Sequence, residues 1–175
     1  LVSAAKQVNL PTILDFLAER FGALPEDEAG RWACRQVQLT IADFVMEIHD
    51  THHPLGPTLH YEDQKAEAKR RAQVFRKHRM PKFLGYFERL ADRNGGTLVE
   101  GGVSYADLSM FQTLEGLAFA FPNAVELVKS DIPKLLALRD AVAERPAIAS
   151  YLRSDRRQPF NEHGLFRRYP ELDPA

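Results

Sequence analysis

The stretch "GGVSYADLSMF" (residues 101–111) lies in the interior of a 175-residue chain and is typical of the start of a helix. Ser104 stands three residues ahead of Asp107, directly before an apolar run. In a capping box the serine hydroxyl accepts a hydrogen bond from the Asp107 N–H, and the Asp107 carboxylate accepts one from the Ser104 N–H. Val103 and Leu108 would form the accompanying hydrophobic staple. We expect these four residues to be structural rather than catalytic.

Helical spacing dominates the sequence on both sides of this stretch, and strand-like alternation is nearly absent. Apolar residues recur at intervals of three and four within segments that proline or glycine bounds. This pattern predicts an all-α fold, a bundle of about six to eight helices joined by short loops. We expect a short helix between Pro11 and Gly22, a long one from Asp27 to His49, and a charged one from Tyr61 with a kink or a short break at Pro81. The capped helix follows Ser104, and shorter helices are expected at 123–129, at 131–145 and after Pro146.

The last segment, residues 155–175, is rich in proline and aromatic residues and shows no helical period. Phe160, Leu165, Phe166 and Tyr169 have no helix of their own on which to pack. We therefore expect this segment to cross the surface of the bundle as an ordered strap.

Charge and cysteine content exclude several classes of protein. The formal net charge is -1, from 23 basic and 24 acidic residues, which gives no long-range field to attract nucleic acid or an anionic membrane. No apolar run approaches the roughly 20 residues that span a bilayer, and we expect no signal segment. Cys34 is the only cysteine, so we expect a buried structural thiol in a reducing, cytoplasmic compartment. Neither nucleic acid nor membrane is an expected partner.

Histidines gather after the first long helix, where His49, His52 and His53 accompany Asp50. Imidazole and carboxylate groups can bind zinc. However, no pair has the regular i, i+4 spacing, and adjacent histidines usually point apart. We therefore expect no metal and favour helix capping and loop hydrogen bonds, with the lining of a ligand cleft as the alternative. Asp43, at the edge of the apolar stripe, either forms a salt bridge on the surface or between subunits, or contacts a polar ligand.

The capping box, written here as Gly-x-Ser-x-Ala-Asp, resembles the start of the central helix in the C-terminal domain of glutathione S-transferases. Other segments agree along nearly the whole chain. "TILDFLAERFGALPEDEAGR" (residues 12–31) resembles the last helix of that family's thioredoxin-like domain and the linker that follows. "QLTIADFVMEIHDTHHP" (residues 38–54) and "PFNEHGLFRRYPELD" (residues 159–173) resemble the first long helix and the tail of a sigma-like bacterial or fungal branch.

The resemblance implies a domain division. Residues 1–24 would be the remnant of a thioredoxin-like domain with its linker, and residues 25–175 the all-α C-terminal domain, usually part of a homodimer. The missing half would supply the Tyr or Ser that stabilises the glutathione thiolate, and the chain does begin with Leu1 rather than Met. Where the family has Gln or Glu followed by Ser or Thr at the last helix, Gln7 is out of register and Leu10 replaces the hydroxyl residue.

The resemblance also assigns site residues. Glutathione would be the co-substrate, a small hydrophobic electrophile would be the substrate, and no residue of this chain is catalytic. Asp43 matches an acid that approaches glutathione near or across the dimer interface. The substrate wall would come from the end of the first long helix and from the exposed turn of the capped helix: Val45, Met46, His49, Asp50, Ser109 and Gln112.

The resulting hypothesis is the substrate-binding helical domain of a detoxifying glutathione transferase, inactive without its other half. The alternative is a non-catalytic interaction module, because helical domains of this type also mediate assembly in translation factors and synthetase complexes. A weaker third hypothesis is a carrier of apolar ligands in the same cleft.

Overall fold

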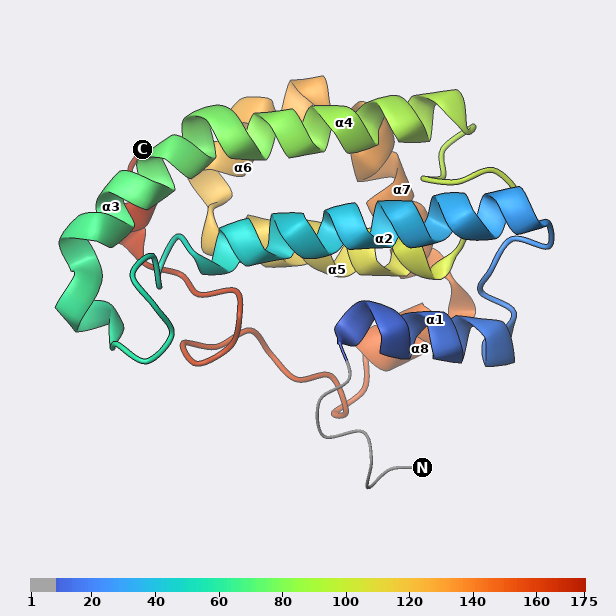
Figure 1. The fold of residues 1–175 in the computed structure, drawn as a ribbon, viewed down its shortest axis with the longest axis horizontal. Coiled ribbons are helices and arrows are strands. Elements are labelled where there is room, and N and C mark those ends of the chain that lie inside the picture. Colours follow the sequence, from blue (N-terminus) through green and yellow to red (C-terminus); the bar gives the residue numbers. More distant parts are fainter. Residues whose placement is uncertain (1–8) are drawn as a thin grey trace.

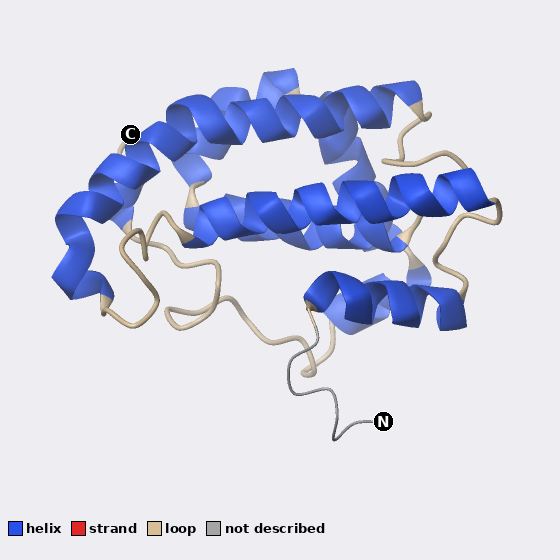
Figure 2. Cartoon of the chain, in the orientation of Figure 1, coloured by secondary structure: helices blue, strands red, loops and turns tan. Residues whose placement is uncertain are grey.

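The capped helix α5 (Tyr105–Ala120) lies alongside the long helix α2 (Glu28–His49) in the middle of the molecule (Figure 1). The computed structural model describes residues 9–175, within which there are eight α-helices and no strand (Figure 2). The prediction of an all-α bundle is confirmed. The expectation for Gln7 lies outside the described residues. The other helices are α1 (Leu10–Phe21), α3 (Lys65–Val74), α4 (Met80–Arg93), α6 (Pro122–Val128), α7 (Pro133–Glu144) and α8 (Pro146–Leu152), with short 3-10 turns at Tyr61–Gln64, Lys129–Asp131 and Pro170–Leu172.

The first two helices begin and end where the sequence predicts. Helix α1 has Pro11 in its first turn, and Gly22 ends it in the left-handed conformation, with φ 65° and ψ 34°. Helix α2 begins after Asp27, whose carboxylate accepts a hydrogen bond from the Gly30 N–H at 2.8 Å. None of the helices in the described part of the chain is long and apolar enough to cross a membrane.

Helices α3 and α4 form one curved run along the edge of the molecule (Figure 1). A π-turn, η2 (Phe75–Arg79), joins them, and the Met80 N–H donates to the Phe75 carbonyl across it. Pro81 follows in the first turn of α4, where its missing N–H and its ring are tolerated. The kink predicted near Pro81 is therefore confirmed, and it takes the form of a widened turn just before the proline.

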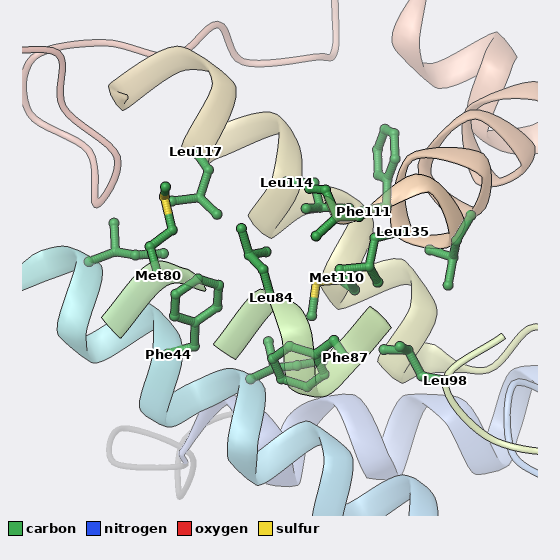
Figure 3. Close-up of a cluster of buried hydrophobic side chains, with 14 of the residues drawn as sticks. Phe44, Met80, Leu84, Phe87, Leu98, Met110, Phe111, Leu114, Leu117 and Leu135 are labelled. Atoms are coloured by element: carbon green, nitrogen blue, oxygen red, sulfur yellow. The ribbon is translucent and has the colours of Figure 1, made fainter. Parts of the chain in front are cut away.

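The core fills the space between α2, α4, α5 and α7 (Figure 3). Phe44 of α2 is fully buried and stacks on Phe83 of α4, with ring centroids 4.7 Å apart. Removing a buried ring of this kind typically destabilises a domain by about 3–5 kcal/mol. The core side chains seen in Figure 3 include Phe44, Met80, Leu84, Phe87, Leu98, Met110, Phe111, Leu114, Leu117 and Leu135.

After α8 the chain runs back along the bundle as an extended segment, which we call the strap (residues 153–175; orange to red in Figure 1). Its aromatic side chains hold it to the bundle. Phe166 lies directly on Gly116, and a Cβ atom at that position of α5 would collide with the ring. Tyr169 stacks on Tyr61 with centroids 3.7 Å apart.

Helix α1 packs on α2 and α5 with only part of its surface. Ala18 is buried, and Asp15 pairs with Arg35 of α2 at 3.1 Å. The opposite side of the helix is apolar and exposed. Its exposed residues, with their exposed fractions, are Leu10 (61%), Ile13 (39%), Phe16 (52%), Leu17 (40%) and Phe21 (79%).

Candidate functional site

The start of α5 is a capping box around a fully buried carboxylate. One oxygen of Asp107 accepts from both the N–H and the hydroxyl of Ser104, each at 2.7 Å. The other accepts from the Leu98 N–H at 2.8 Å, a bond that nothing in the local sequence indicates. Burial raises the pKa of the Asp107 carboxyl, and these hydrogen bonds oppose the rise. With both oxygens occupied, the group holds the helix and the preceding loop in place. Val103 and Leu108 pack against the core beside it.

Cys34 of α2 lies next to this cap, close to Ser104 and Tyr105. The thiol is fully buried, and burial raises its pKa above the ordinary value. A thiol that stays protonated and out of contact with water is a poor nucleophile. Cys34 is therefore a structural residue, as the sequence predicts.

The candidate residues of α2 fall on two sides of the helix. Asp43 and Met46 are exposed, Met46 to 57%, and they share an outward face with Leu39. Val45 is half-buried and packs against the core, so less of it is open to a substrate. Closer to the helix end, His49 lies 3.8 Å from the Asp50 carboxylate, measured from Nδ1 to Oδ1. The face with Asp43 and Met46 is the more open of the two.

The candidate residues of α5, Ser109 and Gln112, lie on the outer side of the helix between two contacts to other segments. Near the start of the helix, the Tyr105 N–H donates to Ala23 in the linker after α1. Near its end, Phe119 stacks on Phe160 of the strap at 5.1 Å. Between these contacts Ser109 is half-buried and Gln112 is exposed. Within residues 9–175, no hydrogen bond or ion pair links Ser109 or Gln112 to the candidates on α2.

The three histidines at the end of α2 converge, and the expectation that His52 and His53 point apart is wrong. Their Nδ1 atoms are 2.5 Å apart, and the ring of His49 stacks on that of His53 with centroids 5.2 Å apart. The reason is the closing turn of the helix, in which the N–H groups of both His52 and His53 donate to the His49 carbonyl at 3.2 Å. Burial lowers the pKa of His52 to about 4.

The strap contributes contacts to this region that the sequence did not reveal. His52 Nε2 lies 2.9 Å from the Leu165 carbonyl, 113 residues further along the chain. In the sequence, Gly116 is the residue that could indicate such a contact, because a glycine inside a helical pattern often marks a close approach by another segment. A shallow hollow of about 390 Å³ also opens where the strap begins, between Phe119, Phe160, Arg153 and Arg157. None of the predicted site residues lines it.

Comparison with known proteins places this arrangement in a family. The profile of the family described as "Glutathione S-transferase, C-terminal domain" matches residues 49–155, more than half of the chain. The chain belongs to this family. A glutathione S-transferase of Plasmodium yoelii yoelii is 28% identical over 85 residues, which are 48% of this chain and 39% of that protein. The matched part thus spans well under half of that relative.

Solved structures with the same fold come from insects, bacteria and worms. Prostaglandin synthase D of Nilaparvata lugens has a TM-score of 0.69 at 22% identity, covering 88% of this chain and 71% of that one. A glutathione transferase of Burkholderia graminis, with two glutathione molecules bound per subunit, has a TM-score of 0.61 at 24% identity, covering 87% and 62%. A monomeric glutathione S-transferase of the hookworm Necator americanus has a TM-score of 0.65 at 18% identity, covering 88% and 71%. At these identities the likeness establishes the fold alone.

Proposed function

We propose that this chain is the substrate-binding helical domain of a glutathione transferase that joins the glutathione sulfur to a small hydrophobic electrophile. The observation that carries the proposal is the outer side of α5, where Gln112 is exposed and Ser109 half-buried between the contact to the linker after α1 and the contact to the strap. A polar interval on a rigid, capped helix can orient a substrate without moving itself. Met46 supplies exposed apolar surface on the neighbouring helix.

In this proposal the Tyr or Ser that stabilises the glutathione thiolate comes from a thioredoxin-like domain outside these 175 residues. The apolar face of α1, with Phe16 52% exposed and Phe21 79% exposed, is suited to pack against such a domain. If α1 packs on that domain, the boundary between the thioredoxin-like part and the helical domain lies at about residue 24, in the linker after α1. Glutathione thiolate then attacks the electrophilic carbon, the carbon–sulfur bond forms and the leaving group departs with its electron pair. This chain positions the electrophile and excludes water, and no side chain of it takes or gives a proton.

The outward face of α2 supports a second element of the proposal, a homodimer. Trp32, Leu39 and Met46 follow one another at intervals of seven residues and are 61%, 56% and 57% exposed. Three large apolar side chains in one stripe are typical of a helix that packs on another copy. Asp43 lies on the same face, where it would approach glutathione near the dimer interface. Because the similar Necator americanus protein is monomeric, the oligomeric state needs its own measurement, by light scattering of the wild type and of Leu39→Glu.

The function is tested with glutathione and a chlorodinitrobenzene as the electrophile. We expect the 175-residue chain alone to be inactive, and the product of the whole gene to be active. In the active protein, Gln112→Ala should raise the KM for the electrophile by about threefold to tenfold, as expected for the loss of about one hydrogen bond. Gln73→Ala, a change of the same kind on the exposed side of α3, should leave it unchanged.

Two results would contradict this assignment. Conjugation by the isolated chain would show that the thiolate does not need a second domain. An inactive whole-gene product that instead retains a specific protein in a pull-down, through the apolar faces of α1 and α2, would favour the interaction module.

A reducing, cytoplasmic compartment remains part of the proposal because of the single buried thiol of Cys34.

A further inference from the structure

The C-terminal end of α2 gathers three imidazoles at one point. One ring nitrogen from each of His49, His52 and His53 lies within 4.8 Å of the other two. We propose that these three histidines form a binding site for a divalent transition-metal ion such as Zn²⁺. Imidazole nitrogen is a preferred ligand for Zn²⁺, and three protein ligands leave one of its four positions open.

The backbone fixes this convergence. Because the N–H groups of His52 and His53 both donate to the His49 carbonyl, the chain after α2 turns back on the last helical turn. Thr51 tightens the turn, its hydroxyl donating to the Ile48 carbonyl at 2.6 Å. His52 and His53 are buried, at 1% and 8% exposure, and the half-buried His49 forms the side of the site that is open to solvent. The site is therefore built into the backbone and does not depend on long flexible side chains.

His52 has the outer hydrogen bond that metal ligands usually have, and His49 has a carboxylate near its ring but beyond hydrogen-bond distance. A carbonyl oxygen only accepts, so the 2.9 Å contact to Leu165 requires a proton on His52 Nε2 and leaves a lone pair on Nδ1. His49 Nδ1 faces the Asp50 carboxylate at 3.8 Å, which leaves its Nε2 to bind. A ring N–H directed at a carbonyl or carboxylate orients an imidazole and raises its basicity toward a metal.

A zinc ion would require movements of about an ångström in two directions: the His52 and His53 nitrogens must separate, and the third nitrogen, within 4.8 Å of them, must approach. Nitrogens bound tetrahedrally at about 2.0–2.1 Å from zinc are roughly 3.4 Å apart. The two Nδ1 atoms of His52 and His53 are 2.5 Å apart, and because His52 Nδ1 carries the lone pair, His53 Nδ1 must donate the proton between them. Small rotations of the two rings would separate the two Nδ1 atoms by the missing distance of about one ångström. The ion could then bind once the proton has left His53 Nδ1.

Charges of both signs surround the histidine cluster. The C-terminus of α2, which carries the negative end of the helix dipole, points at the cluster. Asp50 adds a carboxylate, which the Arg71 side chain partly neutralises at 3.7 Å. Arg167 of the strap opposes binding, because its charge acts on both His52 and His53, and His60 faces His53 from the next loop. A bound ion would link α2 to the strap through His52 and Leu165.

The test uses the 175-residue chain without a purification tag, dialysed against a chelator. Competition with a chromophoric chelator should show one equivalent of Zn²⁺ bound at micromolar or lower Kd. Co²⁺ in its place should give the intense visible absorption of a tetrahedral site. His49→Gln and His52→Gln should each weaken Zn²⁺ binding at least tenfold, whereas His78→Gln, on the exposed side of the π-turn, should change it less than twofold.

Each outcome decides the question. Circular dichroism checks the fold, and if His52→Gln does not fold, the half-exposed His49→Gln alone decides. Less than one equivalent of Zn²⁺ bound, the absence of the visible Co²⁺ band, or equal affinity in His49→Gln would overturn the proposal. The cluster would then be a hydrogen-bonded fastening for the strap and nothing more.

Discussion

Two buried aspartates each hold the start of a helix, and they do so from very different distances along the chain. Asp107 caps α5 from three residues inside the same helix. Asp173, near the end of the strap, caps α6 from 50 residues away, accepting from the N–H groups of Asn123 at 2.8 Å and Ala124 at 3.1 Å. The two carboxylates are 0% and 4% exposed. Both carboxylates accept from backbone N–H groups, but Asp107 accepts from residues that precede its helix, whereas Asp173 accepts from the first turn of α6.

The difference shows which parts of the domain unfold together. Asp107 lies between α5 and the loop at Leu98, where several helices of the core meet. Asp173 ends a strap that a few separate contacts hold. We therefore expect the local cap to contribute to the stability of the whole domain, and the remote cap to control chiefly whether the strap stays closed.

The largest effect is expected for Asp107→Ala. The change leaves the Ser104 and Leu98 N–H groups buried without an acceptor, and we expect the free energy of unfolding to fall by about 3 kcal/mol. Urea unfolding followed by circular dichroism measures it. Asp107→Asn, which keeps one acceptor oxygen, should lose less than Asp107→Ala. Equal losses would mean that one acceptor oxygen does not preserve the cap, and that both oxygens of the carboxylate are needed.

A smaller effect is expected for Asp173→Ala. Two N–H groups at the start of α6 lose their acceptor, and water can replace it once the strap lifts, so we expect a loss of about 1–2 kcal/mol. Hydrogen exchange at Asn123 and Ala124 should accelerate at least tenfold, while the amides of α5 stay protected. Faster exchange throughout α5 would show that the two caps belong to one cooperative unit.

Gly116→Ala should release the strap with little change in global stability. Alanine favours the helix by about 1 kcal/mol over glycine, whereas the collision with Phe166 opposes it by a similar amount. We expect the net change to stay below about 1 kcal/mol, with trypsin cutting after Arg167 and Arg168 at least fivefold faster. Phe166→Ala in the same chain should remove any loss of stability, and a loss that persists would place the strain elsewhere.

The smallest effect is expected at Cys34. The thiol is buried beside Ser104, and its raised pKa keeps it protonated as the pH rises through the range where an exposed cysteine ionises. Reaction with a thiol reagent should therefore require opening of the local cap. We expect faster labelling in Asp107→Ala and a rate within twofold of wild type in Asp173→Ala. Equal acceleration in both variants would contradict the separation of the two regions.

The same contrast explains what the sequence could predict. Helix starts and ends were accessible because each depends on residues a few positions apart, such as Asp27 with Gly30, or Ser104 with Asp107. The contact between His52 and Leu165 spans 113 residues and has no local pattern. The convergence of the histidines was missed for a related reason. It depends on the shape of one closing turn, which residue spacing alone does not specify.

For the candidate site residues, the helical period indicates the exposed fraction only in part. Met46 and Gln112 are on open surface, as a substrate wall requires, but Val45 is half-buried against the core. A helical period places residues on a face and cannot say where a distant segment covers that face. The strap does so over Gly116, and Ser109, seven residues earlier on α5, is half-buried.

The π-turn between α3 and α4 changes which residues of the two helices lie on the same side. Buried side chains follow steps of three and four along both helices, except for one step of five from Phe75 to Met80. At about 100° per residue, positions eight apart on a regular helix differ by about 80°, whereas positions seven apart differ by about 20°. By absorbing one residue, the π-turn brings Arg71 and Arg79 into line, and both reach the Glu47 carboxylate, at 3.4 Å and 2.5 Å. The extra residue of the π-turn therefore keeps Arg71 and Arg79, eight positions apart, on the same side of the helical run, and both can bind Glu47 of α2.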